Sequence, residues 1–250
     1  MLLNLETLIK KFSIKTSGVI HIGAHKGEEV EAYEQLFDTD IPIHLFEPQK
    51  KYFEFIKSKY RDSKNIKLYE YGCGEKVEDL ELNIASNDGL SSSVLEPKLH
   101  LEVHPDVKFT SKEVISLRTL DSFNILDSNF LNIDIQGYEL NALRGSLNTL
   151  LKITYVYLEI NKEEVYKECP LVHEIDTFLD KFGFIRVSTK YAYDKLPWGH
   201  ALYVKKKELT KFQIVKSMIK KYIYNVEFLY KFYIILRKLY WKTKSSAKNK

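Results

Sequence analysis

The sequence is poor in cysteine, glycine, proline and methionine. Its 250 residues include 2 cysteines, 10 glycines, 6 prolines and 2 methionines. The two cysteines, Cys73 and Cys169, cannot form a disulfide framework, and no cluster of cysteine and histidine has zinc-site spacing. No metal is predicted, and a reducing cytoplasmic compartment is the expected location.

Signals for export and for phosphate binding are also missing. Glu6, Lys10 and Lys11 interrupt the apolar N-terminal stretch, which therefore reads as a short packing helix and not as a signal peptide. In the first glycine-bearing turn, His25 stands where a dinucleotide site of the form Gly-x-Gly-x-x-Gly requires its second glycine. Lys26 is not followed by serine or threonine, so there is no P-loop either.

What remains is the layout of an adenosine site without phosphates. An apolar run, Val19–Ile22, ends at Gly23, and a second run ends at Glu47-Pro48, 24 residues after that glycine. In open α/β sheets such a turn lets backbone approach the ligand, and the acid at the next strand tip takes the ribose hydroxyls. S-adenosylmethionine is the common ligand of this kind, and a purely steric role for the glycine is the alternative.

Short apolar runs alternate with helical patterns along most of the chain. This alternation predicts an α/β fold with a doubly wound, mostly parallel sheet and an antiparallel closing pair at 184–189 and 201–204. The nearly all-apolar run Phe130–Ile135 should lie at the sheet centre, and Leu140–Leu151 should form one helix. Residues 87–112 break the rhythm and predict either a lid or a surface insertion.

The segment Asn132–Glu139 resembles the FkbM-type S-adenosylmethionine-dependent methyltransferases. Its Asp-x-x-Gly-x-Glu pattern follows an apolar strand, as in that family's fourth motif. Gly23–Gly27 and Glu47-Pro48 are similar to the family's cofactor turn and ribose acid, and further similarities are Ser91-Ser92-Ser93, Leu120-Asp121, Glu159 and Trp198-Gly199. The resemblance implies a class I methyltransferase (Rossmann-like) fold and methyl transfer, usually to an oxygen of a sugar or small metabolite.

The resemblance and the turn chemistry together give the expected cofactor residues. S-adenosylmethionine is expected to contact His21, Gly23, Ala24, His25, Gly27, Glu47, Pro48, Gly72, Cys73 and Asp134. Many family members have an acid where this chain has His21. His21 could instead accept a hydrogen bond from the methionine amino group as a neutral imidazole. The acceptor is expected to contact Ser91, Ser92, Ser93 and Trp198, for which turn and core roles are the alternatives.

Three residues are expected to carry the chemistry. Methyl transfer is an in-line displacement that needs alignment and removal of a hydroxyl proton, and Asp134 stands at the tip of the central strand where such a group belongs. Asp134 and Glu159, from adjacent strands, are expected to flank a hydroxyl or share a cation. His200 is the most plausible acceptor-site histidine, and a hydrogen bond that holds the turn is the alternative for Asp134.

Charge divides the chain into two parts. Residues 1–204 carry 24 basic and 32 acidic side chains, a net charge of −8, whereas residues 205–250 carry 14 and 2, a net charge of +12. This predicts a Rossmann-like domain over 1–207 and a basic tail over 208–250. Apolar residues recur every three or four positions from Phe212 to Tyr240, which predicts an amphipathic helix. Charged residues interrupt it too often for a membrane span.

The tail suits either an anionic membrane interface, which would make the protein peripheral, or a partner helix or the body of the protein. Nucleic acid is not expected as a partner, because the acidic body would repel it. The leading hypothesis is an O-methyltransferase acting on a glycan or other small hydroxylated acceptor. The rivals are a non-catalytic or NAD-type nucleotide-binding module and a membrane-docked interaction protein.

Overall fold

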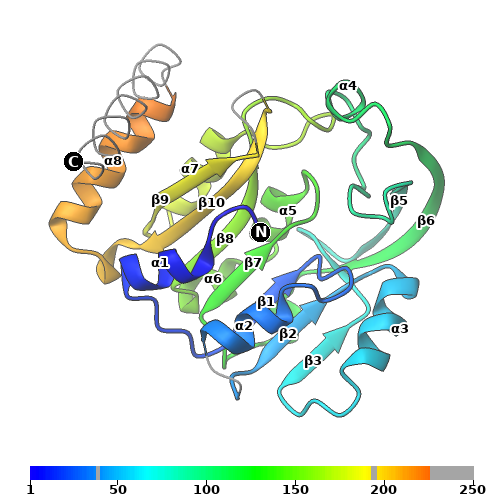
Figure 1. Cartoon of the computed structure of the whole chain (residues 1–250), viewed down its shortest axis with the longest axis horizontal. Helices are drawn as coiled ribbons and strands as arrows, with labels where there is room; N and C mark the ends of the chain where they lie inside the picture. Colours follow the sequence, from blue (N-terminus) through cyan, green and yellow to red (C-terminus); the bar gives the residue numbers. More distant parts are fainter. Residues whose placement is uncertain (38–39, 193–195, 226–250) are drawn as a thin grey trace, which may run out of the picture.

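The main body of the protein is a seven-stranded sheet with helices on both faces (Figure 1). The structure is a computed structural model that describes residues 1–37, 40–192 and 196–225, with side chains as far as residue 220 in the last helix. The main-sheet strands are β1 (Val19–Ile22), β2 (Ile43–Phe46), β3 (Ile66–Tyr69), β7 (Phe130–Ile133), β8 (Tyr155–Asn161), β9 (Phe184–Tyr191) and β10 (Trp198–Lys205).

The strand order is β3-β2-β1-β7-β8-β10-β9. The first five strands of that order pair in parallel, and β10 pairs antiparallel with both β8 and β9. The chain runs outward from β1 in one direction and later from β7 in the other, so the order reverses between these two strands. Ligands of open α/β sheets bind at the carboxyl ends of the strands at such a switch point. The prediction of a doubly wound, mostly parallel sheet with an antiparallel closing pair is confirmed.

Two apolar layers hold the helices against the sheet. The strands β1, β2 and β7 are buried on both faces, which explains their largely apolar sequences, whereas the edge strand β3 is only partly buried. One layer takes residues from α1 (Leu5–Phe12), α2 (Val30–Leu36) and α3 (Lys50–Lys59). The opposite layer takes residues from η1 (Leu120–Phe123), α5 (Glu139–Arg144), α6 (Leu147–Lys152) and α7 (Val172–Asp180).

A second, three-stranded sheet projects beside the carboxyl ends of the main sheet (Figure 1). It consists of β4 (Gly72–Cys73), β5 (Glu78–Ala85) and β6 (Phe109–Arg118), in the order β4-β6-β5. The strands β5 and β6 pair antiparallel over a longer stretch than their apolar residues alone predicted. The excursion between them carries α4 (His100–Val103), and several of its residues line the cavity described below.

The helix expected over Leu140–Leu151 is two helices. Gly145 and Ser146 separate α5 from α6, and the single-helix prediction is therefore wrong. A β-carbon at Gly145 would lie 1.9 Å from the carbonyl oxygen of Gly74, so the chain after β4 passes directly over this helix end. The break between the two helices therefore coincides with a tertiary contact. In the local sequence, only Gly145 indicates that the helix ends there.

The charged C-terminal part begins with η2 (Lys206–Glu208) and α8 (Lys211–Asn225). Leu209 and Ile214 pack on the layer that also holds α1, so the start of α8 lies against the body beside β9 (Figure 1). The expected helix beyond residue 225 lies outside the described residues, and the division of the chain at residue 207 stays a prediction. Within the described part of the chain, no helix is long and apolar enough to cross a membrane.

Candidate functional site

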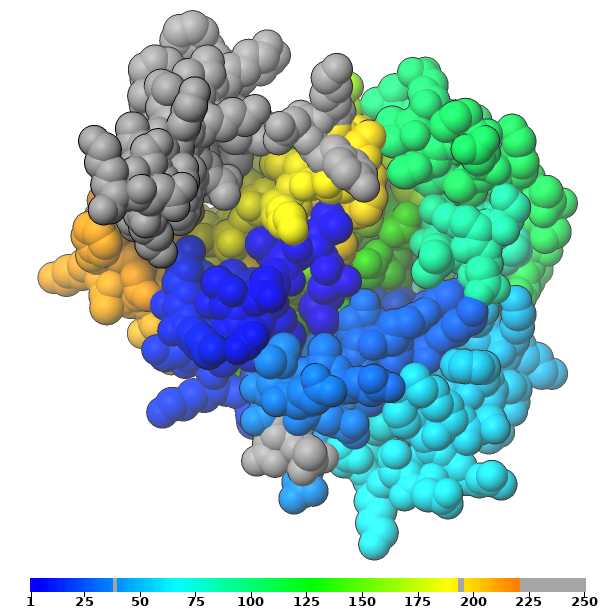
Figure 2. Space-filling view, viewed as in Figure 1, coloured from blue at the N-terminus to red at the C-terminus, as the bar shows by residue number. Residues whose placement is uncertain are grey.

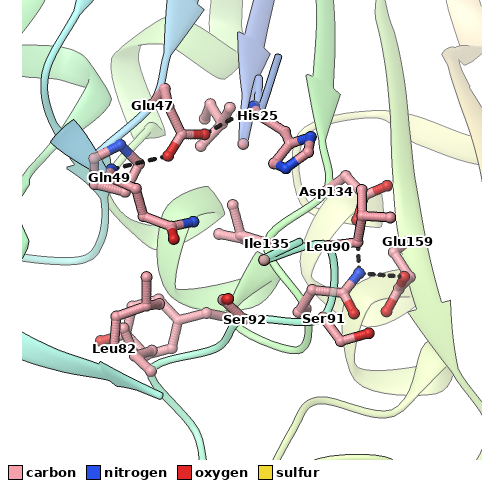
Figure 3. A pocket seen from close by; sticks show the side chains of 18 of the residues that line it. His25, Glu47, Gln49, Leu82, Leu90, Ser91, Ser92, Asp134, Ile135 and Glu159 are labelled. Carbon is pink, nitrogen blue, oxygen red and sulfur yellow. Dashed lines mark hydrogen bonds between the residues drawn. The ribbon is translucent and has the colours of Figure 1, made fainter. Parts of the chain in front are cut away.

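A cavity of about 510 Å³ lies over the carboxyl ends of the central strands (Figure 3). The surface is hollowed between the N-terminal residues and the green part of the chain (Figure 2). The strand register explains why functional residues gather there. Ile22 pairs with Phe46 and with Ile133, and Ile133 pairs with Leu158. The next residues along these strands are Gly23, Glu47, Asp134 and Glu159, and all four line the cavity.

The turn after β1 is set by close backbone contacts. Gly23 has φ +85°, and a β-carbon on it would lie 2.0 Å from the carbonyl oxygen of Asp134. Only glycine fits this crossing without a backbone shift. The amides of Gly23 and Ala24 both donate to the carbonyl oxygen of Phe46 at 3.0 Å. The turn is thereby fastened to both neighbouring strands at the switch point.

Glu47 faces into the cavity with its carboxylate held by backbone amides. Its two oxygens accept hydrogen bonds from His25 N and Gln49 N, each at 2.8 Å (Figure 3). The residue is 3% exposed, and burial raises the pKa of Glu47 to about 8 despite these two hydrogen bonds. Glu47 therefore remains protonated at a pH where an exposed glutamate is fully ionised, and a hydroxyl-bearing ligand that favours the ionised form would lower this pKa.

The adjoining wall of the cavity is apolar. Pro48, Gly72, Cys73, Ile115 and Leu117 line it. A β-carbon on Gly72 would lie 2.4 Å from a Leu117 methyl group, so glycine is what allows β4 to pass this close to β6. Burial raises the pKa of the Cys73 thiol, which therefore remains a neutral apolar contact. A flat apolar group such as an adenine ring suits this wall.

The opposite end of the cavity holds a hydrogen-bonded group of polar side chains. Gln136 Nε2 donates to Asp134 Oδ1 at 2.9 Å and to Glu159 Oε2 at 3.0 Å (Figure 3). His200 Nε2 lies 3.3 Å from Asp134 Oδ2, and His200 pairs with Glu159 in the β8–β10 register. The side chain of Asp134 is 33% exposed and that of His200 only 6%, while Glu159 is 3% exposed. Asp134 is thus the member of this group that a ligand reaches most easily.

The carboxyl groups at this end differ in their electrostatics. Burial works against ionisation of Asp134, but the hydrogen bond and charge of His200 and the hydrogen bond from Gln136 hold the pKa of Asp134 below its usual value. Burial, with the neighbouring charges of Asp134 and Glu139, raises the pKa of Glu159 well above its usual range. One ionised and one protonated carboxyl group sharing the Gln136 amide is the arrangement that these shifts favour.

Glu139 belongs to the turn and not to the cavity lining. Its Oε1 accepts hydrogen bonds from Ile135 N at 3.2 Å and from Gly137 N at 3.0 Å. The turn contains Gln136 at φ +54° and Gly137 at φ +98°, both in the left-handed region. Glu139 therefore fixes the conformation that presents Gln136 to the two cavity carboxyls.

Asp134, Glu159 and His200 each offer a ligand atom within 4.8 Å of the others, which is close enough to hold a metal ion. The Gln136 amide already donates to both carboxyl groups, and His200 lies against Asp134. These contacts already engage Asp134, Glu159 and His200 Nε2, whereas His200 Nδ1 is buried with no hydrogen-bond partner among the described residues. The absence of a metal requirement stays a prediction.

His21 lies deep beside Gly23 in a buried chain of hydrogen bonds. Asn132 Nδ2 donates to the Tyr33 hydroxyl at 2.7 Å, and the Tyr33 hydroxyl lies 3.4 Å from His21 Nδ1. With the Tyr33 oxygen accepting from Asn132, the Tyr33 hydroxyl can donate its own proton to His21 Nδ1, an arrangement that would leave the imidazole proton on Nε2. Burial lowers the pKa of His21, so the ring is neutral.

Several predicted site residues are engaged in protein contacts. The His25 ring lies 2.8 Å from both a Glu28 carboxylate oxygen and the Asp88 carbonyl oxygen, and so connects the turn after β1 to the excursion. Ala24 is buried in the apolar layer, and Gly27 lies against the Tyr60 ring. Neither of these two is among the residues that line the cavity.

The three serines differ in their positions. Ser91 and Ser92 line the cavity, where Ser91 Oγ accepts from Asn87 Nδ2 and Ser92 Oγ accepts from Ala85 N. Ser93 Oγ donates to the carbonyl oxygen of Gln136 at 2.7 Å and is not a lining residue. Trp198 lines the cavity with its ring edge toward His200.

Reasoning from the sequence missed Gln136 and Gln49. Gln136 lies two residues after Asp134, inside the motif that was noticed, but a glutamine in a turn gives no sign that it bridges two acids. Gln49 contributes a backbone amide to Glu47, and any residue other than proline would do so. Asp88, which pairs with Lys26 and Lys51, was missed for the same reason, since its partners come from other elements.

The chain is similar in sequence and in fold to known methyltransferases. The methyltransferase FkbM domain matches residues 21–186. The 2-O-methyltransferase NoeI of Sinorhizobium fredii (strain NBRC 101917 / NGR234) is 23% identical over 159 residues, which are 60% of this chain and 65% of NoeI. A solved structure of methyltransferase FkbM from Methylobacillus flagellatus KT superposes with a TM-score of 0.52 at 15% identity, over 75% of this chain and 43% of that chain.

The match thus spans less than two thirds of the length of either relative, and the structural likeness concerns the fold alone. The class I methyltransferase fold predicted from the sequence is confirmed. The matched residues include the turn after β1, Glu47, Asp134 and Glu159. On this evidence the chain belongs to the FkbM methyltransferase family.

Proposed function

We propose that the protein is an S-adenosylmethionine-dependent methyltransferase that acts on a hydroxyl oxygen of a sugar-like acceptor. The observation that carries this proposal is the position of Glu47 and Asp134 in one cavity, with an apolar wall beside Glu47 and a polar group around Asp134. The Glu47 carboxylate would accept both ribose hydroxyls, and the wall formed by Cys73 and Leu117 would cover the adenine. This leaves the methionine moiety and the acceptor for the half of the cavity near Asp134.

The methionine end of the cofactor would meet His21. In the tautomer in which the Tyr33 hydroxyl donates to His21 Nδ1, the ring offers Nε2–H as a donor. We infer that His21 donates to the methionine carboxylate, which reverses the acceptor role expected from the sequence. The side chains of Glu28 and Glu29 also line the cavity and supply negative charge for the methionine ammonium group.

Asp134 is the group we assign to the acceptor hydroxyl. The acceptor oxygen attacks the methyl carbon, the carbon–sulfur bond breaks with its electron pair on sulfur, and the hydroxyl proton passes to Asp134. A carboxylate of low pKa suffices because the hydroxyl becomes strongly acidic as the new carbon–oxygen bond forms. His200, through its contact with Asp134, and Gln136, through its two hydrogen bonds, hold the carboxylate in place.

Glu159 would act through the same network. The raised pKa of Glu159 leaves it protonated beside ionised Asp134. It therefore adds no second buried negative charge at the place where the sulfonium loses its positive charge. We therefore assign Glu159 and His200 to positioning and charge balance, and Asp134 to direct contact with the acceptor. The in-line geometry of the two substrates supplies the remainder of the rate enhancement.

The acceptor half of the cavity suits a hydroxylated ring. Trp198 offers an aromatic ring, and Ser91 and Ser92 offer hydroxyl groups. Aromatic faces with nearby hydrogen-bonding groups are typical of sites that fix a small polar ligand in orientation. NoeI is described as a 2-O-methyltransferase, which supports an oxygen acceptor for this chain as well.

An NAD-type site is a weaker interpretation. A pyrophosphate needs free backbone amides at a helix start. Here the His25 amide donates to Glu47, the Lys26 amide donates to Glu28, and a Glu28 oxygen lies against the His25 ring. Two carboxylates thus occupy the amides that a phosphate would need.

The experiment that tests this proposal is methyl transfer from S-adenosylmethionine carrying a labelled methyl group. The full chain is incubated with a panel of hydroxylated sugars, and the label is followed into product. Label in a sugar ether, lost in the Asp134→Asn variant, supports the proposal. Label only in carboxyl or nitrogen acceptors overturns the assignment to a hydroxyl oxygen.

A further inference from the structure

The helix α8 exposes an apolar face that the methyl-transfer site does not use. Phe212 is 74% exposed, Val215 54%, Met218 51% and Ile219 55%. These positions recur at three- and four-residue steps, so they lie along one side of the helix. The other side is occupied, because Ile214 packs on the body and Ser217 is buried.

The same helix carries concentrated positive charge. Lys211, Lys216 and Lys220 lie among the apolar positions, and residues 205–250 contain 14 basic and 2 acidic side chains. One of those two acids, Glu208, lies 3.8 Å from Lys207. Lys11 of α1 is close enough to Lys216 for the two ammonium groups to repel each other. The basic surface thus extends from α8 onto α1.

We propose that α8 docks the protein on an anionic membrane surface, with Phe212, Val215, Met218 and Ile219 inserted among the lipid tails and the lysines at the headgroups. Apolar side chains along one face and lysines beside them are the arrangement that binds helices in the plane of a bilayer interface. The charge selects the lipid, since anionic headgroups attract such lysines whereas zwitterionic headgroups do not.

The position of α8 makes this docking compatible with catalysis. The helix lies beside β9 at one edge of the sheet, away from the β5–β6 arm next to the cavity (Figure 1). A membrane against α8 would leave the arm and its excursion accessible. The proposal is independent of the identity of the methyl acceptor.

The charge of this segment favours a membrane over a second copy of this chain as the partner that covers the exposed face of α8. Two copies meeting through this face would bring together two segments of net charge +12, which repel each other. An anionic surface removes that repulsion. Self-association through α8 therefore becomes an outcome that would overturn the proposal.

The test is co-sedimentation of the full chain with vesicles. One set contains phosphatidylcholine alone, and the other contains about 30 mol% phosphatidylserine, at about 0.1 M NaCl. Binding to the anionic vesicles should be at least roughly tenfold tighter, and about 0.5 M NaCl should weaken it. The double variant Phe212→Glu, Ile219→Glu should lose roughly tenfold or more in binding.

A matched control changes exposed apolar residues elsewhere by the same chemistry. Val114 is 68% exposed on β6 and Leu126 is 64% exposed before β7. The double variant Val114→Glu, Leu126→Glu should bind vesicles within about twofold of the unchanged chain, because the exposed face of α8 is untouched and the change in net charge is equal in both variants. Thermal melting confirms that each variant is folded, and titration with S-adenosylhomocysteine reports on the cavity separately.

Three results would overturn the proposal: equal binding of the α8 variant and the unchanged chain, equal loss in the control variant, or no binding of the folded chain to anionic vesicles. Sedimentation that shows dimers without lipid, abolished by the α8 variant, would assign the face to a second copy instead. If the unchanged full chain binds anionic vesicles but does not bind S-adenosylhomocysteine, the result would count against the proposed function and not against membrane docking.

Discussion

The affinity for S-adenosylhomocysteine should depend on the ionisation of Glu47. The pKa of Glu47 is about 8 in the empty protein because the side chain is 3% exposed. If the ribose hydroxyls donate to the ionised carboxylate, only the ionised fraction binds well. That fraction is about one tenth at pH 7 and about one hundredth at pH 6. Affinity should therefore rise roughly tenfold per pH unit up to pH 8 and level off near pH 9.

The sign follows from linkage between ligand and proton. The ligand favours the ionised form, so its binding lowers the pKa of Glu47 and releases a proton below pH 8. In the empty protein the pKa is raised above the ordinary 4.5, so Glu47 favours the folded state at low pH, and this contribution is lost as the pH rises from 4.5 to 8. The thermal stabilisation given by S-adenosylhomocysteine should accordingly increase from pH 6 to pH 8.5.

The Glu47→Gln variant removes this titration. An amide keeps one acceptor oxygen and turns its NH₂ group toward one of the two backbone amides of His25 and Gln49. Hydrogen bonds to a charged group contribute about 1.5–3 kcal/mol, so affinity at pH 8.5 should fall roughly ten- to a hundredfold. The variant should also lose the pH dependence.

Isothermal titration from pH 6 to pH 9 measures both effects, with the exposed Glu70→Gln variant as the control. The reasoning is refuted if affinity is flat across this range and unchanged in Glu47→Gln.

Four further outcomes are expected. Replacing Asp134 with Asn should lower kcat by roughly a hundredfold or more, because the carboxylate acts on the acceptor proton, while the affinity for S-adenosylhomocysteine changes less than about threefold. Steady-state kinetics measure kcat and calorimetric titration measures the affinity; unchanged turnover would remove Asp134 from the mechanism. Replacing His21 with Ala should weaken S-adenosylhomocysteine roughly tenfold and 5′-methylthioadenosine, which has no carboxylate, by less than about twofold; equal losses would show that His21 does not contact the carboxylate. Replacing Gly23 with Ala should lower the free energy of unfolding by at least about 2 kcal/mol in denaturant titrations, since φ is +85° and the β-carbon would meet the Asp134 carbonyl oxygen; a variant as stable as the unchanged chain would contradict the described turn. Dialysis against a chelator should leave turnover unchanged, because Gln136 and His200 already satisfy the Asp134–Glu159 pair; activity restored only by a divalent cation would identify the cluster as a metal site.

The main sheet could be predicted because its central strands β1, β2, β7 and β8 are buried on both faces. Such strands have continuous apolar sequences, and in a parallel sheet the residues that follow them meet at one edge. Gly23, Glu47 and Asp134 were found by that rule, and the register pairs of Ile22 with Phe46 and Ile133 show why it works here. The structure adds that His200, just before the predicted strand 201–204, pairs with Glu159, which the sequence did not predict.

What could not be predicted depends on contacts between distant segments. The break at Gly145 follows from the passage of Gly74 over the helix end. Ala24 belongs to the expected cofactor turn by sequence, but its side chain is buried in the apolar layer. The donor role of His21 depends on Tyr33 and Asn132, which come from α2 and β7. No pattern within one segment contains this information.

The central claim is that this cavity binds an adenosyl ligand without phosphates. Titration of the folded full chain with S-adenosylhomocysteine at pH 8.5, followed by the same titration with NAD, tests it most directly. We predict one saturable site for S-adenosylhomocysteine and no heat of binding for NAD. Saturable binding of NAD, or no binding of S-adenosylhomocysteine by the folded protein, would contradict the account.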